Sequence, residues 1–194
     1  MRYFVFKVVA EEAGFIDAYP RGSPTDWKFE RGISLATEFP LGGEVSFSEN
    51  YPDDQNIYDF QPNLMSDLLV SGKARKVIES LGVSNAEWLP VTVKNQQGHV
   101  VGPDYAFLNL QGTEDAIDMG RSTYEINHIL KDQVGLIENL VLQPQRISSD
   151  AKFFRCGTYR RLILVRDDVL TAFEDAGLTG FKTYDAEGWD GVEI

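Results

Sequence analysis

Apolar residues near the N-terminus fall on both sides of an extended chain. Tyr3, Val5 and Val9 share one side, and Phe4, Phe6 and Val8 share the other. A strand that is covered on both faces inside a sheet has this pattern. Lys7 interrupts the apolar run and Glu11 follows it, so the pattern favours a strand over a signal peptide.

Two later segments repeat one pattern: a short apolar strand, an amphipathic helix of about three turns, and a glycine just past the last apolar position. The first consists of residues 69–71, 74–81 and Gly82, and the second of residues 164–166, 169–176 and Gly177. Apolar runs at 88–93 and 180–184 return each unit to a strand. The sequence thus predicts two strand–helix–strand units, which are either an internal duplication or two ordinary units.

The remaining elements are shorter. Strands are expected at 104–110, 139–142 and 153–154, and Pro90, which lacks an amide donor, places its strand at an edge or near its own start. Ser122 and Glu125 fit a capping box and predict a helix through Ile126, Ile129 and Leu130. The pattern as a whole predicts an α+β fold with a mixed sheet.

Residues 11–66 are rich in loops, mainly at 11–32 and 40–66. Long loops inside a compact domain are often functional, so a binding surface is expected there. A chain of 194 residues with 43% hydrophobic residues is long enough to bury a core, and we expect residues 1–194 to form a single domain.

Charge changes sign along the chain. The acidic segment, residues 38–67, contains no lysine or arginine and the carboxylates of Glu38, Glu44, Glu49, Asp53, Asp54, Asp59 and Asp67. The basic segment, residues 146–166, has Arg146, Lys152, Arg155, Arg160, Arg161 and Arg166 against Asp150. Residues from 167 onward are acidic again, and the chain carries a net charge of −12. This total predicts no binding to nucleic acid, and favours an internal role in which these arginines offset the flanking acids.

Aromatic residues alternate with the carboxylates of the acidic segment: Phe39, Phe47, Tyr51, Tyr58 and Phe60. Such a mixture suits docking of a basic protein, since aromatic rings supply buried area and carboxylates steer association. A solvated loop whose aromatic rings cover the protein's own core explains the same pattern.

The usual catalytic and metal motifs are weak. His99 and His128, the two histidines, are expected on a hairpin loop and a helix surface, and the single Cys156 is expected to be a small buried hydrophobe. Asp53, Asp54, Asn56 and Asp59 form a dense group of oxygen ligands, but the glycine required at the sixth position of a calcium-binding loop is missing. No phosphate-binding glycine motif occurs in the sequence. We therefore expect no cofactor, no metal and no catalytic residue.

Two other classes of function stay open. A small hydrolase could use a pair of carboxylates, because with 30 acidic residues almost any pair could meet in space. A binding module could use the rings of Trp27, Trp88 and Trp189 as platforms, although packing in the core explains tryptophans equally well.

A set of ordered motifs between residues 67 and 185 resembles a known family. The motifs are residues 69–71, which open a predicted helix, the predicted strands 89–93 and 140–142, and Asp115 and Asp118, which precede Ser122. The others are residues 105–109, 154–155, 164–165 and 177–181. In order and spacing they are similar to immunity protein family eleven of bacterial polymorphic toxin systems. The resemblance implies that the chain binds a cognate toxin and has no catalytic residues. Because the N-terminal pattern favours a strand over a signal peptide and no apolar run is long enough to span a membrane, we expect the protein in the cytoplasm.

Charge adds a hypothesis about the contact surface. Toxins that act on nucleic acid are generally basic, so an acidic inhibitor would be steered toward them. We expect Asp53, Asp54, Tyr58, Asp59 and Phe60 to contact the toxin. No apolar run is long enough to span a membrane, so no membrane partner is expected.

Overall fold

The computed structural model describes residues 1–192 and shows an α+β fold that is mostly sheet. The strands are β1 (Tyr3–Val8), β2 (Gly43–Ser46), β3 (Phe60–Gln61), β4 (Leu68–Ser71), β5 (Ala86–Lys94), β6 (Val100–Leu110), β7 (Thr123–Ile126), β8 (Val134–Asn139), β9 (Phe153–Arg155), β10 (Ile163–Arg166) and β11 (Phe181–Asp185). The helices are α1 (Trp27–Glu30), α2 (Gly72–Ser80) and α3 (Asp167–Asp175), with a 3₁₀ turn at Pro144–Arg146. The expected fold class is confirmed.

Both predicted strand–helix–strand units are present, and their sheets have matching strand orders. One sheet runs β2-β5-β6-β4-β3 and the other β11-β1-β10-β9. In the first, α2 connects β4 to β5 across the antiparallel strand β6, and in the second α3 connects β10 to β11 across the antiparallel strand β1. β3 and β9 then pair with β4 and β10 in the same antiparallel sense. β2 has no counterpart in the second sheet, and the counterpart of β6 is β1, which precedes β9 in the chain.

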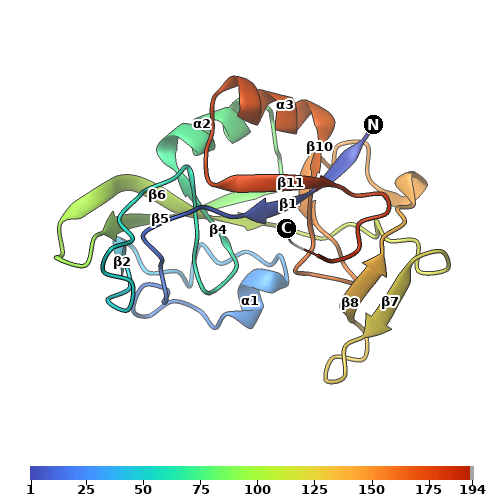
Figure 1. Ribbon diagram of the computed structural model, residues 1–194, viewed down its shortest axis with the longest axis horizontal. Helices are drawn as coiled ribbons and strands as arrows, with labels where there is room; N and C mark the ends of the chain where they lie inside the picture. The colour runs from blue at the N-terminus through green and yellow to red at the C-terminus, as the bar shows by residue number, and fades with distance from the viewer. Residues whose placement is uncertain (193–194) are drawn as a thin grey trace.

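Helices α2 and α3 lie side by side over one face of the sheets, with α1 on the opposite side (Figure 1). A core beneath the two helices draws from both sheets, including Phe6 of β1, Phe60 of β3, Val70 of β4 and Val165 of β10. The rings of Phe6 and Phe60 meet edge to face, with centroids 4.8 Å apart. The apolar faces that the periodicity identified therefore meet in one shared core.

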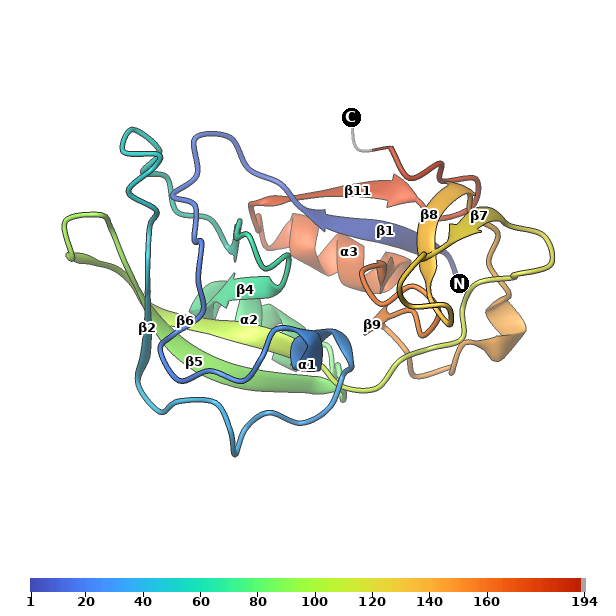
Figure 2. The same ribbon diagram turned by 90° about the horizontal axis from the view of Figure 1, so that it is seen from below.

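The outer faces of the sheets have separate covers. Residues 13–47 close the outer face of the β2–β6 sheet, where Ile16, Phe29 and Phe47 are buried against Leu89 and Phe107. Figure 2 shows this N-terminal segment and α1 crossing the β5–β6 pair. Residues 116–142 cover the other sheet, so both faces of β1 are packed, as predicted. None of the helices in residues 1–192 is long and apolar enough to cross a membrane.

Two expected elements are wrong. The residues of the predicted capping box begin strand β7, because the Ser122 hydroxyl accepts a hydrogen bond from the Val141 amide instead of capping a helix. Ile126 pairs with Val134 in the β7–β8 hairpin, so the helix through Leu130 does not form. The strand expected at 139–142 is mostly absent, since β8 ends at Asn139 and Leu142 forms an isolated bridge to Ile117. The expectation for Pro90 is also wrong, since β5 lies between β2 and β6 and begins at Ala86. Its missing amide is tolerated because β2 pairs with β5 only from Val91 onward.

Candidate functional site

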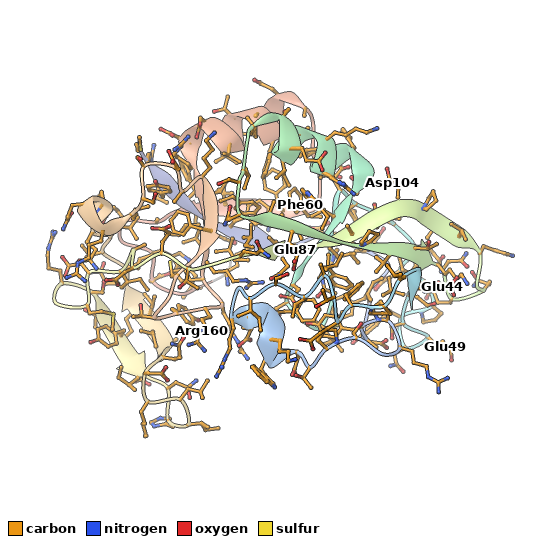
Figure 3. The ribbon with its side chains drawn as sticks, turned by 180° about the vertical axis from the view of Figure 1, so that it is seen from behind. Glu44, Glu49, Phe60, Glu87, Asp104 and Arg160 are labelled. Carbon is orange, nitrogen blue, oxygen red and sulfur yellow. The ribbon has the colours of Figure 1, made fainter. Side chains whose placement is uncertain are left out.

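The part of the acidic segment around Glu44 and Glu49 lies at one end of the molecule, and four carboxylates of the segment are ion-paired. Glu38 pairs with Lys28, Glu44 with Lys94, Asp59 with Lys73 and Asp67 with Arg155. Within residues 1–192, no cation lies within ion-pair distance of Glu49, Asp53 or Asp54. Glu44 and Glu49 lie together at this end, well away from Arg160 of the basic segment (Figure 3). Glu44 and Glu49 are therefore separated from Arg160, whereas Asp67 of the acidic segment is buried against Arg155 of the basic segment.

Phe60 is a correction to the expected toxin-contacting set. Its side chain is 0% exposed and its ring packs against Phe6, Phe173 and Phe181. Because β3 places this side chain in the shared core, it has no surface to offer a partner. The alternative that aromatic rings of the acidic segment cover the protein's own core is confirmed for Phe60, as it is for Phe39 and Phe47.

Asp59 is also committed to internal contacts. Its carboxylate accepts hydrogen bonds from the Ser71 hydroxyl at 2.6 Å and from the amide and hydroxyl of Thr179 at 3.1 and 3.2 Å. It also lies 3.6 Å from the ammonium of Lys73. These contacts tie the acidic segment to the start of α2 and to the loop before β11, so Asp59 positions the segment.

Asp53, Asp54 and Tyr58 lie on the surface, with Asp53 exposed and the other two partly buried. Their loop is fastened to the β5–β6 hairpin, because the Gln96 amide donates to the carbonyls of Tyr51 and Asp54 at 3.0 and 3.3 Å. The Tyr58 hydroxyl donates to the carbonyl of Glu11 at 2.8 Å. The loop is therefore held in one shape, and residues around Gln96 and Glu11 that the sequence did not single out support it.

Two hollows flank this loop. A groove of about 380 Å³ runs between the end of β1, residues 12–15 and Tyr51, and its charged lining residues are Glu12 and Asp54. A second hollow of about 480 Å³ has Asp17, Glu44 and Glu49 as its charged lining residues. Every charged residue lining either hollow is a carboxylate, so both favour a cationic group.

The basic segment forms internal pairs, and two of them, with Asp67 and Asp168, offset the flanking acidic segments as expected. The five pairs with carboxylates are Arg146–Asp115, Arg155–Asp67, Arg160–Asp132, Arg161–Glu30 and Arg166–Asp168. Arg155 and Asp67 are the buried members, with side chains 2% and 5% exposed. Burial raises the pKa of Asp67 although Arg155 and the Tyr19 hydroxyl beside it favour the ionised form.

A carboxylate that sequence reasoning missed is Glu87 on β5 (Figure 3). It accepts hydrogen bonds from Ser34, from the amide of Leu35 at 2.8 Å and from Asn109 at 2.8 Å. Burial raises the pKa of Glu87, but these donors outweigh it and hold the pKa below its usual value. Glu87 thus anchors residues 33–36 across the sheet; no local motif marks it, since its partners are distant in sequence.

The other candidate residues have structural surroundings. Cys156 is fully buried and burial raises the pKa of its thiol, whereas His99 and His128 are exposed. Among the tryptophans, Trp189 is buried, Trp88 lies under Arg75, and the exposed Trp27 is covered in part by Arg31. In residues 1–192, no group of three or more His, Cys, Asp or Glu side chains is arranged to hold a metal ion.

Comparison with protein-family models matches residues 9–188 to an immunity protein family, Imm11. The chain belongs to this family. The match covers nearly the whole chain, so it confirms the resemblance and extends it to the N-terminal loops, which the motifs at 67–185 did not reach. Comparison with curated proteins gave no match. Membership in Imm11 indicates a role in toxin immunity and a toxin as the partner.

Proposed function

We propose that this Imm11 protein neutralises a cognate toxin by binding it stoichiometrically in the cytoplasm, through the acidic end that carries Asp53, Asp54 and Tyr58. Asp59 holds this surface in place. The observation that carries the proposal is that Asp53 and Asp54 have no ion-pair partner among residues 1–192 and lie on a loop fastened by Gln96. Two hollows flank this loop, and all their charged lining residues are carboxylates. Unpaired carboxylates at a surface attract a basic partner over several ångströms and raise its association rate.

Protection of cells tests the immunity role. The protein encoded beside this chain's gene is expressed with and without it, and the purified pair is titrated. We expect survival only when this chain is present, and full neutralisation at equal molar amounts without consumption of a substrate. Killing despite excess of this chain, or catalytic removal of the toxic activity, would contradict binding as the mechanism.

The acidic surface has its own test, which is the double substitution Asp53→Lys with Asp54→Lys. Association with the toxin should slow by about 10- to 1000-fold at low salt, and its dependence on salt should flatten, since steering is lost. Association rates are measured by stopped flow across a range of salt concentrations. Unchanged rates at every salt concentration would reject this surface and leave the immunity role intact.

A further inference from the structure

The groove beside Asp54 is shaped for one kind of side chain. Seven of its nine lining residues are apolar or aromatic, among them Val8, Ala10, Phe15 and Tyr51. The two others, Glu12 and Asp54, are carboxylates. The groove thus combines apolar walls with negative charge, which is the complement of a long cationic side chain.

Backbone hydrogen bonds form the walls of this groove in advance. The Asn56 amide donates to the carbonyl of Glu12 at 3.1 Å, and the Gly14 amide donates to the carbonyl of Asn56 at 2.9 Å. The rings of Phe15 and Tyr51 meet edge to face with centroids 6.0 Å apart. Because these contacts order the groove without a ligand, a partner has little conformational entropy to remove on binding.

The carboxylates of the groove lack a cation of their own. Within residues 1–192, neither Glu12 nor Asp54 has an ion-pair partner. Lysine and arginine bury their methylene stems against apolar surfaces and keep the charged head at a polar rim. A carboxylate at that rim forms a charge-assisted hydrogen bond with the head group.

We propose that the groove is the anchor site of the interface and receives a lysine or arginine side chain from the toxin. The stem lies against Val8, Ala10 and Phe15, and the cationic head pairs with Glu12 and Asp54. This inference rests on the proposed function, and it adds a distinct role: Asp53 steers the toxin, whereas Glu12 and Asp54 retain it.

Kinetics of the complex separate these two roles. Glu12→Gln with Asp54→Asn should increase the dissociation rate from the toxin by about tenfold or more, since loss of a partly desolvated charge pair acts on dissociation. Asp53→Asn should reduce mainly the association rate. Asp175→Asn on α3, an exposed residue, is the matched control for loss of one negative charge and should change neither rate by more than about twofold.

Blocking the groove without changing its charge provides a second variant. Ala10 is partly exposed in the groove wall, so Ala10→Trp should fill the space and also speed dissociation. Thermal unfolding and circular dichroism of each variant check that the fold is retained. If the Gln/Asn double variant dissociates at the control rate while the toxin is still neutralised, the anchor site is rejected and immunity stands.

A probe that needs no toxin makes the two proposals independent. Glycine-rich pentapeptides with a central arginine, lysine, citrulline or norleucine are titrated at millimolar concentration into ¹⁵N-labelled protein. The cationic peptides should shift the amides of Glu12, Ala13 and Asp54, and the neutral peptides should not. If the neighbouring toxin is not bound but these shifts occur, the immunity proposal fails and the groove remains a site for cationic side chains. If the cationic peptides cause no shifts and the toxin is not bound, both the groove proposal and the immunity proposal are rejected.

Discussion

The buried side chain of Arg155 connects distant parts of the chain. Its guanidinium donates to Asp67 at 2.8 Å and to the carbonyl of Arg160 at 3.2 Å, and Asp67 also accepts from the Tyr19 hydroxyl. The three side chains come from β9, from the turn before β4 and from the N-terminal loop. A single buried pair therefore links both sheets to the loop that covers one of them.

Arg155→Met should reduce the free energy of unfolding by about 3–5 kcal/mol, because it leaves the carboxylate of Asp67 buried without its cation. Without Arg155, the pKa of Asp67 rises further, so Asp67 in the variant becomes protonated, and hence neutral, as pH falls. The difference in free energy of unfolding between the variant and the wild type should therefore become smaller at acidic pH. Urea unfolding at several pH values measures both effects. Arg161→Met, which removes an exposed arginine, should change stability by no more than about 0.5 kcal/mol. A similar loss from both variants would contradict this role.

Residues close together in the chain can differ greatly in their exposure to solvent. Asp53 is exposed, Asp59 is largely enclosed and Phe60 is in the core. The alternation of acidic and aromatic residues indicated that the segment was unusual. It could not tell a contact surface from a cover of the core, because that distinction depends on which distant elements lie beneath each side chain.

Among the secondary-structure elements, helix α2 begins after Ser71, whose hydroxyl makes two hydrogen bonds. The Ser71 hydroxyl accepts from the Ala74 amide at 3.1 Å and donates to Asp59 at 2.6 Å. It thereby joins a helix cap to the acidic segment. Helix α3 lacks a side-chain cap from Arg166 and instead has Asp167 and Asp168 in its first turn, where negative charge is favourable.

Ser71→Ala should destabilise the protein by about 1–2 kcal/mol, since the cap and the bond to Asp59 are lost together. Ser80→Ala is the control: its exposed hydroxyl donates to the Val77 carbonyl near the end of the same helix. It should change the free energy of unfolding by no more than about 0.5 kcal/mol. Thermal and chemical denaturation measure the free energy of unfolding of both variants. Equal losses in the two variants would contradict a special contribution of Ser71 to stability.

In the whole molecule, the two sheets share a central core. Phe6, Phe60, Phe153 and Phe173 form a network of ring contacts that crosses from one sheet to the other and to α3. Because each sheet completes the core of the other, neither is expected to remain folded alone, which agrees with a single domain.

Unfolding should accordingly be one cooperative transition. Trp88 reports on the β2–β6 sheet and Trp189 on the core of the other sheet. Single-tryptophan variants that retain one or the other should show fluorescence transitions at the same urea concentration, coincident with the transition seen by circular dichroism. Separate midpoints for the two tryptophans would indicate two independently folding domains.

Elements with local signals can be predicted from the amino-acid sequence alone. Hydrophobic periodicity and terminal glycines were sufficient for β1 and for the units around α2 and α3, since these features depend on neighbours within a few residues. The capping box predicted at Ser122 is wrong because its hydroxyl accepts a hydrogen bond from the distant Val141 amide instead of from an amide in the next turn of the chain.

The role of each residue in the acidic segment depends on long-range contacts. Nothing in the sequence distinguishes its carboxylates from one another. Lysines and arginines from other elements pair with four of them, whereas Glu49, Asp53 and Asp54 have no ion-pair partner among residues 1–192. The groove at Glu12 and Asp54 likewise exists because the chain at 12–14 bonds to Asn56. Charge and pattern are properties of the chain, whereas a binding surface arises from long-range contacts that bring some charges together and neutralise others.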